Sequence, residues 1–299
     1  MVKKPGKLYL YHLNYNLQKM IQRVCVCGAG TMGRGIAEVF ARAGFYTILY
    51  EPDPTVLEKA RNSIGDSLYK LVEKNKIPAV DKEKTLQRIV FTNDLHQCLA
   101  DVIIEAITEK IEAKVSLFNR LAEINHGETV FATNTSSLSV TRIAEAVINP
   151  RRLIGMHFFN PAPVMRLVEI VNTKYTGGET TALILNVAEQ IGKTPVVCKD
   201  APGFIVNRVA RPFYIEAFRL LEAKISDPAG IDYLMESSGF KMGPFRLMDL
   251  IGNDINYAVS SSIYEQLNWP ERLKPSYIQK DKVEKGELGK KTGKGYYQY

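Results

Sequence analysis

The sequence predicts an α/β protein: an N-terminal doubly wound, mostly parallel sheet followed by an all-helical C-terminal domain. From Arg23 to Lys199, short apolar runs alternate with segments of helical period, which is typical of βαβ units. Beyond about residue 200 only the helical period remains. The 299 residues suffice for two buried cores. We therefore expect domains at 20–199 and 200–299.

The expected elements follow from these periods. The strands are RVCVC (23–27), YTILY (46–50), RIVF (88–91), DVIIEAI (101–107), TVFAT (129–133), RLIGMHF (152–158), RLVEIV (166–171) and TPVVCK (194–199). The helices between them are expected at 31–44, 54–74, 111–124, 139–148 and 181–192, the last closed by a glycine. The C-terminal helical stretches are 205–223, 231–239 and about 245–267.

Residues 1–19 are a basic lead with no continuous apolar core and no small-residue cleavage site, so we do not expect a signal peptide. Because IQRVCVCGAG follows Met20 at once, we expect this lead to be a loose extension or a start codon assigned too early. No apolar run reaches the ~18 residues that a membrane-spanning helix needs, so no membrane partner is expected.

The net charge and the cysteines indicate which kinds of ligand and which cellular compartment to expect. The net charge of +7 favours an anionic ligand, and nucleic acid is not expected because no dense Lys/Arg run with interleaved aromatic residues occurs. Cys25 and Cys27 share a strand face, but a C-x-C without a second pair is poor zinc spacing. We expect these two, Cys98 and Cys198 to be reduced thiols of a cytoplasmic protein, with no metal site.

The segment GAGTMG, residues 28–33, follows the first strand and opens a helix. Its glycines Gly28, Gly30 and Gly33 allow, in turn, a tight turn, close approach of the backbone to a pyrophosphate, and packing of the helix on the strand. The helix N-terminus attracts phosphate. This context predicts a Rossmann-type dinucleotide site, which also includes Ala29, Thr31 and Met32.

Glu51 ends the second strand, about 20 residues beyond the glycines, where a carboxylate binds the ribose 2′-hydroxyl. The carboxylate would repel the extra phosphate of NADP, and no arginine follows in Pro52-Asp53-Pro54. We therefore expect NAD. The alternative is that Glu51 is only a solvated charge at the end of a strand.

His157 ends a strand on the side where open α/β sheets bind ligands, and the prolines at 161 and 163 turn the chain away. Glu169 lies among apolar residues of the next strand, where a carboxylate is costly to bury unless it is paired. If the two strands form a hairpin, Glu169 can hold the imidazole while His157 takes a proton. The alternative is a packed core histidine.

The chain resembles the L-3-hydroxyacyl-CoA dehydrogenase family, and within it the short bacterial 3-hydroxybutyryl-CoA dehydrogenases. The resemblance runs from about Arg23 to Tyr299. It rests on GAGTMGRGIA, EAITE, NTSSLSVTRIA, GMHFFNPAPVMRLVEIV, KDAPGFIVNR and GELGKKTGKGYY. Several of these motifs are long and occur in order, so the resemblance is specific.

The resemblance implies NAD-dependent oxidation of a (S)-3-hydroxyacyl-CoA to a 3-ketoacyl-CoA, and the reverse, in a homodimer formed through the helical domain. It implies that His157 is the general base, that Glu169 is its partner, and that Ser136 and Asn207 orient the substrate. Further cofactor contacts are implied at Glu109, Lys114, Asn134, Asn160 and Lys291, and substrate contacts at Ser67, Lys74, Lys114, Ser136 and Asn160.

Plainer interpretations exist for several of these residues. Ser136 could cap a helix, Asn207 could be a polar residue at a helix start, and Lys114 and Lys74 could be solvated. Rival functions are an NAD-dependent dehydrogenase of a hydroxy acid without coenzyme A, or a non-catalytic, crystallin-like NAD-binding protein. The sequence does not indicate the acyl chain length or the pathway.

Overall fold

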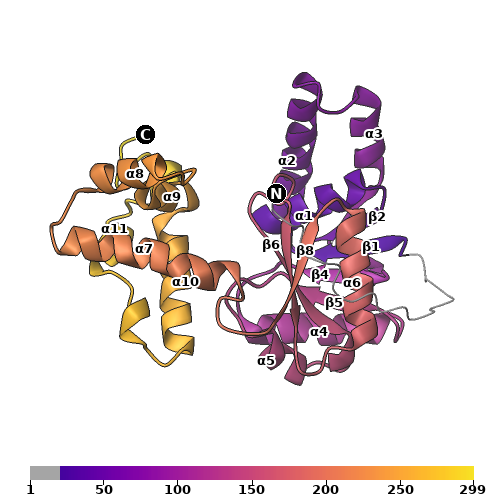
Figure 1. The fold of residues 1–299 in the computed structure, drawn as a ribbon. Coiled ribbons are helices and arrows are strands. Elements are labelled where there is room, and N and C mark those ends of the chain that lie inside the picture. The colour runs from indigo at the N-terminus through magenta and orange to yellow at the C-terminus, as the bar shows by residue number, and fades with distance from the viewer. Residues whose placement is uncertain (1–20) are drawn as a thin grey trace, which may run out of the picture.

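The computed structural model describes residues 21–299, so the expectation for residues 1–19 lies outside the described residues. The N-terminal part is built on one sheet in the strand order β3-β2-β1-β4-β5-β6-β7-β8 (Figure 1). The strands are β1 (Arg23–Cys27), β2 (Tyr46–Tyr50), β3 (Ile89–Thr92), β4 (Val102–Glu105), β5 (Val130–Thr133), β6 (Leu153–Phe158), β7 (Leu167–Asn172) and β8 (Thr194–Lys199).

The strands from β1 to β6 are parallel, whereas β7 pairs antiparallel with β6 and β8 runs parallel to β7. Each of the eight corresponds to a strand predicted from the sequence. The strand order reverses between β1 and β4, since β2 lies on one side of β1 and β4 on the other. In open α/β sheets a ligand binds at such a reversal, at the carboxyl ends of the strands.

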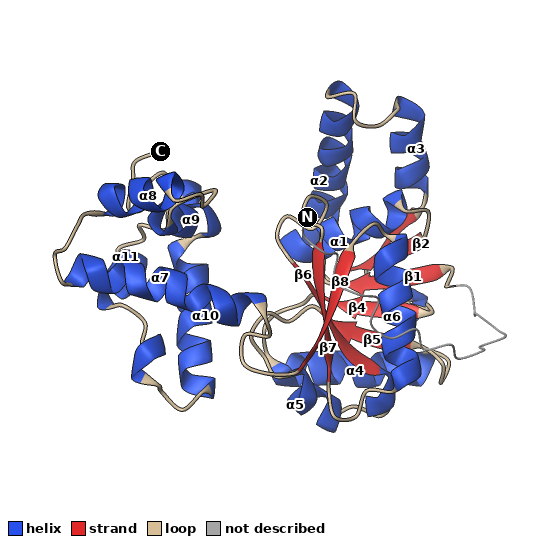
Figure 2. Ribbon diagram, viewed as in Figure 1, coloured by secondary structure: helices blue, strands red, loops and turns tan. Residues whose placement is uncertain are grey.

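Helices cover both faces of the sheet (Figure 2), so the predicted doubly wound architecture is confirmed. One face packs against α1 (Thr31–Arg42), α2 (Pro54–Glu73) and α6 (Gly178–Gln190). The other packs against α4 (Ile111–Ile124) and α5 (Val140–Glu145). In β1, Val24 and Val26 belong to the first core and Cys25 and Cys27 to the second, as the strand period requires.

The C-terminal part is helical, as predicted, with a core around Phe218, Phe245 and Met248. Its helices are α7 (Val206–Glu222), α8 (Pro228–Ser237), α9 (Pro244–Ile251), α10 (Asn253–Gln266) and α11 (Tyr277–Glu284). The stretch predicted at 245–267 is not one helix, because Gly252 between α9 and α10 has a φ of 105° and turns the chain.

The sequence did not predict α3 (Ala79–Gln87) or α11. Both are short and polar, and each buries one residue, Thr85 in α3 and Gln279 in α11. The single-turn 3₁₀ helices are Leu95–Gln97, Pro150–Arg152, Glu271–Leu273 and Lys290–Thr292. Among residues 21–299, no helix combines the length and apolar character needed to cross a membrane.

The helical part lies beside the sheet domain, and the two meet where α7 begins (Figure 1). Gln266 at the end of α10 donates to the carbonyl of Ser137 at 2.7 Å. Asp200, after β8, accepts the Ser139 hydroxyl at 2.7 Å and the Thr141 N–H at 2.8 Å. These contacts tie the end of α10 and the segment that leads into α7 to the residues between β5 and α5.

Candidate active site

The glycine loop after β1 is closely packed at its first and third glycines and is open at its second. Gly28 has a φ of 100°, and a Cβ there would lie 2.6 Å from the Ala106 carbonyl oxygen. A Cβ on Gly33 would lie 1.7 Å from the Gly28 carbonyl oxygen, so helix and loop are in contact. A Cβ on Gly30 would meet nothing within 4 Å. This cradle beside the N-terminus of α1 fits the pyrophosphate of a dinucleotide.

Glu51 follows β2 and lies against the same loop. Its Oε2 accepts the Ala29 N–H at 3.0 Å, and its Oε1 accepts the Asp53 N–H at 3.3 Å. The Asp53 side chain caps α2 by accepting the Thr55 N–H at 2.8 Å. These bonds keep the carboxylate at the reversal of strand order, where the ribose of a bound dinucleotide lies in this fold.

His157 and Glu169 face each other across β6 and β7, which confirms the predicted hairpin and contact. They are register partners, and His157 Nδ1 lies 2.7 Å from Glu169 Oε2. His157 is 5% exposed and Glu169 0%. Since a carboxylate only accepts, a neutral imidazole bonded this way carries its hydrogen on Nδ1. Its Nε2 then has a free lone pair that can take a proton.

Glu169 is also bonded to the start of the helical part. Its Oε1 accepts the N–H groups of Ile205 and Val206, both at 2.9 Å. Burial raises the pKa of this carboxyl, but the bonds from His157 and these two N–H groups outweigh burial and leave the pKa below its ordinary value. Glu169 therefore stays ionised, and one carboxylate links the histidine to α7.

The His157 ring is held by aromatic neighbours. The Phe159 ring centroid lies 4.6 Å from that of the imidazole, and the Phe204 centroid lies 5.6 Å away. Phe204 is buried, with a φ of 47° in the turn before α7. With Glu169 on its Nδ1 side, the imidazole is restricted to one orientation.

A second ionic cluster lies at the carboxyl end of β4, buried except for Glu109. Lys114 on α4 is 1% exposed, and its ammonium lies 2.5 Å from Glu105 and 3.1 Å from Glu109. Glu105 is also bonded by the Thr133 hydroxyl at 2.7 Å. Lys114 is therefore not the solvated helix residue of the plainer interpretation, and its contact with cofactor and substrate stays a prediction.

Glu109 connects this network to the loop that carries Ser136. Its Oε1 accepts the Thr135 hydroxyl at 2.6 Å and the Ser136 N–H at 3.1 Å. Burial raises the pKa of Glu109, but Lys114, Thr135 and the Ser136 N–H lower it below its ordinary value. An ionised Glu109 therefore fixes the backbone at Ser136, which follows β5 at the same sheet edge as His157.

The other predicted residues are placed as follows. Asn134 accepts the Phe158 N–H at 2.8 Å and so ties the Ser136 loop to the His157 strand. Asn160 is exposed just beyond β6, and Asn207 lies in the first turn of α7, next to the residues that bond Glu169. Ser67 is partly buried on α2, close enough to Glu38 to lower the pKa of that carboxyl, and Lys74 is exposed at the end of α2.

Lys291 is not brought to this edge within one chain. It forms an ion pair with Asp254 at 2.6 Å, near the start of α10. The opposite end of α10 is the one that contacts Ser137. Twelve residues of helix separate Asp254 from Gln266, which is about 18 Å at the rise of an α-helix. Its cofactor contact stays a prediction.

Sequence reasoning missed Glu105 and Thr135. The signal for Glu105 was present, because a carboxylate at the end of the apolar run VIIE repeats the pattern that singled out Glu169. Thr135 had no such signal, since its importance comes from Glu109, which lies 26 residues away in the chain.

A glycine loop with a ribose-type carboxylate, beside a buried His–Glu pair at the strand ends, defines a dinucleotide-dependent dehydrogenase. Comparison with known proteins narrows this class. The model of the 3-hydroxyacyl-CoA dehydrogenase NAD-binding domain matches residues 23–201, and that of the C-terminal domain matches 203–299. The chain belongs to the 3-hydroxyacyl-CoA dehydrogenase family, whose N-terminal domain binds NAD.

Relatives agree over most of the chain. It is 45% identical to the 3-hydroxyadipyl-CoA dehydrogenase of Escherichia coli K12 over 93% of its own length, and spans 59% of that protein. It is 38% identical to a probable 3-hydroxybutyryl-CoA dehydrogenase of Deinococcus radiodurans, covering 92% of this chain and 99% of the relative. The structure of (S)-3-hydroxybutyryl-CoA dehydrogenase PaaH1 from Ralstonia eutropha superposes with a TM-score of 0.89 at 36% identity, covering 93% of this chain and 99% of that one.

Proposed function

We propose that this protein interconverts (S)-3-hydroxyacyl-CoA, such as 3-hydroxybutyryl-CoA, and 3-ketoacyl-CoA, with NAD as the redox partner. The observation that carries the proposal is the His157–Glu169 pair, with its 2.7 Å contact, at the strand ends beside the glycine loop. Relatives named for 3-hydroxybutyryl-CoA and 3-hydroxyadipyl-CoA support the substrate class.

His157 acts as the general base in this proposal. NAD, when bound, supplies the hydride acceptor for C3 of the substrate. The 3-hydroxyl gives its proton to Nε2 of His157, while Glu169 holds Nδ1 and stabilises the imidazolium that forms. A base placed in this way contributes roughly 10²–10⁴-fold to the rate.

Ser136 and Asn207 orient the substrate in this proposal. Ser136 is fixed through Glu109, and Asn207 through the first turn of α7. Ser136 lies in the segment after β5 and Asn207 in the segment after β8, and both segments lead toward the end of the sheet that carries His157. Together they direct the substrate oxygen and its thioester side toward the base.

The proposed cofactor contacts centre on the glycine loop and Glu51, and Lys291 would join them from outside this sheet edge. The loop supplies backbone N–H groups for the pyrophosphate, and Glu51 accepts from the ribose hydroxyls and disfavours NADP. The residues proposed to bind NAD are Gly28, Ala29, Gly30, Thr31, Met32, Gly33, Glu51, Glu109, Asn134, Asn160 and Lys291. For Lys114 we propose a positioning role through Glu109, because its ammonium is already paired with two carboxylates.

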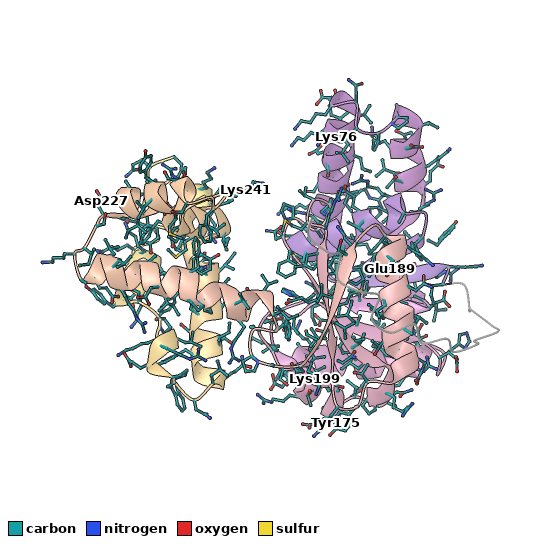
Figure 3. All side chains as sticks on the ribbon, in the orientation of Figure 1. Lys76, Tyr175, Glu189, Lys199, Asp227 and Lys241 are labelled. Carbon is teal, nitrogen blue, oxygen red and sulfur yellow. The ribbon has the colours of Figure 1, made fainter. Side chains whose placement is uncertain are left out.

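The coenzyme A part of the substrate carries phosphates, which suits a chain of net charge +7. We assign its contacts to the α2 side of the sheet domain, at Ser67 and Lys74. Figure 3 places Lys76 at the tip of the α2–α3 hairpin and Lys241 on the edge of the helical part that faces it. Lys76 and Lys241 are both exposed, and exposed cations of this kind favour binding of a polyanion.

Acetoacetyl-CoA and free acetoacetate distinguish this function from its rivals. The proposal predicts NADH oxidation with acetoacetyl-CoA and a far lower kcat/KM with free acetoacetate. A Lys74→Met variant should raise KM for acetoacetyl-CoA with little change in kcat, whereas Lys285→Met in the helical part should alter neither. Equal turnover of the acid and the thioester would favour a hydroxy acid dehydrogenase, and NADH binding without any turnover would favour the non-catalytic alternative.

We also propose that two copies associate through the helical part. Apolar side chains there are largely exposed in one chain, among them Val209 at 71%, Tyr233 at 72% and Leu234 at 65%. Light scattering of the purified protein tests this, with a Leu234→Glu variant expected to shift the mass toward one chain. A cytoplasmic location is proposed from the free cysteines of the described chain.

A further inference from the structure

Three cysteines meet beneath the glycine loop. Cys25 and Cys27 point to the same face of β1, with their sulfur atoms 3.8 Å apart. Cys98, after the 3₁₀ helix Leu95–Gln97, joins them, and the three sulfur atoms lie within 4.8 Å of one another. All three side chains are 0% exposed. In the sequence only Cys25 and Cys27 lie close together, so it is the fold that brings Cys98 to them. We call these three residues the thiol cluster.

The ligand chemistry of the thiol cluster selects soft ions. Thiolate sulfur prefers thiophilic metals and metalloids over hard cations. Among residues 21–299, the group of side chains placed to hold a metal ion consists of these three cysteines. Structural zinc takes four ligands, one more than the thiol cluster offers. A three-ligand ion therefore suits the cluster better than zinc does.

Net charge decides among the soft ions, because the thiol cluster is buried and a net charge there is costly. Three thiolates leave a charge of −2 with a monovalent ion, −1 with a divalent ion and none with a trivalent ion. The buried cation nearby, Lys114, is already paired with Glu105 and Glu109. A trivalent ion bound by the three thiolates therefore gives an occupied site with no net charge.

We propose that Cys25, Cys27 and Cys98 form a binding site for trivalent arsenic, and that its occupation weakens NAD binding. Arsenous acid, As(OH)₃, condenses with the three thiols. Three As–O bonds and three S–H bonds break, three As–S bonds form, and each hydroxyl leaves with one thiol proton as water. Arsenic stays trivalent, so no oxidant or reductant is needed.

Cys98 lies next to Leu99, which is 45% exposed, so the loop that carries the third sulfur atom is at the surface.

The thiol cluster touches the cofactor site through Cys27. This residue precedes Gly28 directly, and it is the register partner of Glu105 in β4. The backbone at Gly28 is packed closely on Ala106, where a Cβ would lie 2.6 Å from the carbonyl oxygen, so this turn cannot absorb a movement of Cys27 by itself. A shift of Cys27 toward arsenic is therefore passed on to the rest of the loop. This part of the proposal depends on the glycine loop being the NAD site.

The test is native mass spectrometry of the reduced full-length protein after incubation with sodium arsenite and desalting. The expected mass gain is one arsenic minus three hydrogens per chain. Cys98→Ser should gain no such adduct, and any arsenic it retains should carry a hydroxyl. Cys198→Ser, which removes the cysteine outside the thiol cluster, should behave as wild type. Circular dichroism checks that both variants are folded, with Cys98→Ala as a second test of the same position.

NAD affinity is then measured by calorimetry before and after arsenite loading. We expect at least a tenfold rise in Kd for wild type and Cys198→Ser, and no change for Cys98→Ser. The proposed arsenic site would be overturned if the wild type formed no three-thiol adduct or if Cys98→Ser still formed it. It would also be overturned if the wild type retained cadmium but not arsenic. An unchanged Kd in the loaded protein would overturn the coupling. If the unloaded protein does not bind NAD, the proposed function fails, whatever the mass spectra show.

Discussion

Replacing Glu169 by glutamine tests how the buried carboxylate controls the histidine. In the wild type, Oε2 accepts from His157 and Oε1 accepts from the N–H groups of Ile205 and Val206. An amide has the same shape but carries two donors on its nitrogen. In one orientation the NH₂ group faces His157, and in the other it faces the two backbone N–H groups. Neither satisfies all three donors.

Each orientation has a calculable consequence. With NH₂ toward His157, Nδ1 must accept, so the ring hydrogen moves to Nε2 and the base is lost. The rate should then fall roughly 10²–10⁴-fold, which is about 3–5 kcal/mol of transition-state stabilisation. With NH₂ toward Ile205 and Val206, buried donors face each other, and the folded state loses about 1–3 kcal/mol.

The assay is NADH oxidation with acetoacetyl-CoA, together with urea unfolding of each protein. Glu169→Gln should lower kcat with little change in NADH affinity, and Glu145→Gln is the matched control because Glu145 pairs with Lys174 at the surface. A Glu169→Gln enzyme with kcat within threefold of wild type and unchanged stability in urea would refute the assigned role of this carboxylate.

Three further changes have defined outcomes. Lys114→Met leaves the buried Glu105 without its cation and should cost about 3–5 kcal/mol in urea unfolding, whereas Lys174→Met at an exposed pair should change stability little; equal losses would contradict the network. Gly30→Ala should fold with the Tm of Gly127→Ala, since both glycines lie outside helices at open positions, yet weaken NAD binding at least tenfold; unchanged affinity would remove this glycine from the cofactor site. Because the folded pKa of Glu169 lies below its ordinary ~4.3, the stability advantage of wild type over Glu169→Gln should be complete above that pH and disappear as pH falls through the folded pKa; an advantage that grows in acid would reverse the sign.

The sheet was predictable because its signals are local. Buried strands are short apolar runs, and the helices between them carry their own period. The elements that were missed have weak local signals: α3 and α11 are polar helices that each bury a single residue. The break at Gly252 was missed because both α9 and α10 continue the helical pattern, so one glycine with positive φ separates them without changing the period.

The candidate active site likewise has residues that the sequence could predict and residues that it could not. His157 and Glu169 were predictable, since each is a lone titratable residue in an apolar strand and a hairpin of the two strands brings them together. The inward position of Lys114 was not, because an isolated lysine on a helix is usually solvated and its burial depends on carboxylates from two other segments. Cys98 joins Cys25 and Cys27 from a loop more than 70 residues away, a proximity that depends on β1 and β4 being neighbours.

A His157→Gln variant tests whether His157 takes the proton of the substrate hydroxyl. Acetoacetyl-CoA reduction is followed by NADH absorbance in the wild type and in the variant, and NADH affinity is measured in the same preparations. We expect turnover in the wild type, a loss of at least a hundredfold in the variant, and equal NADH affinity in both. Wild-type turnover that survives the substitution would show that another group takes the proton.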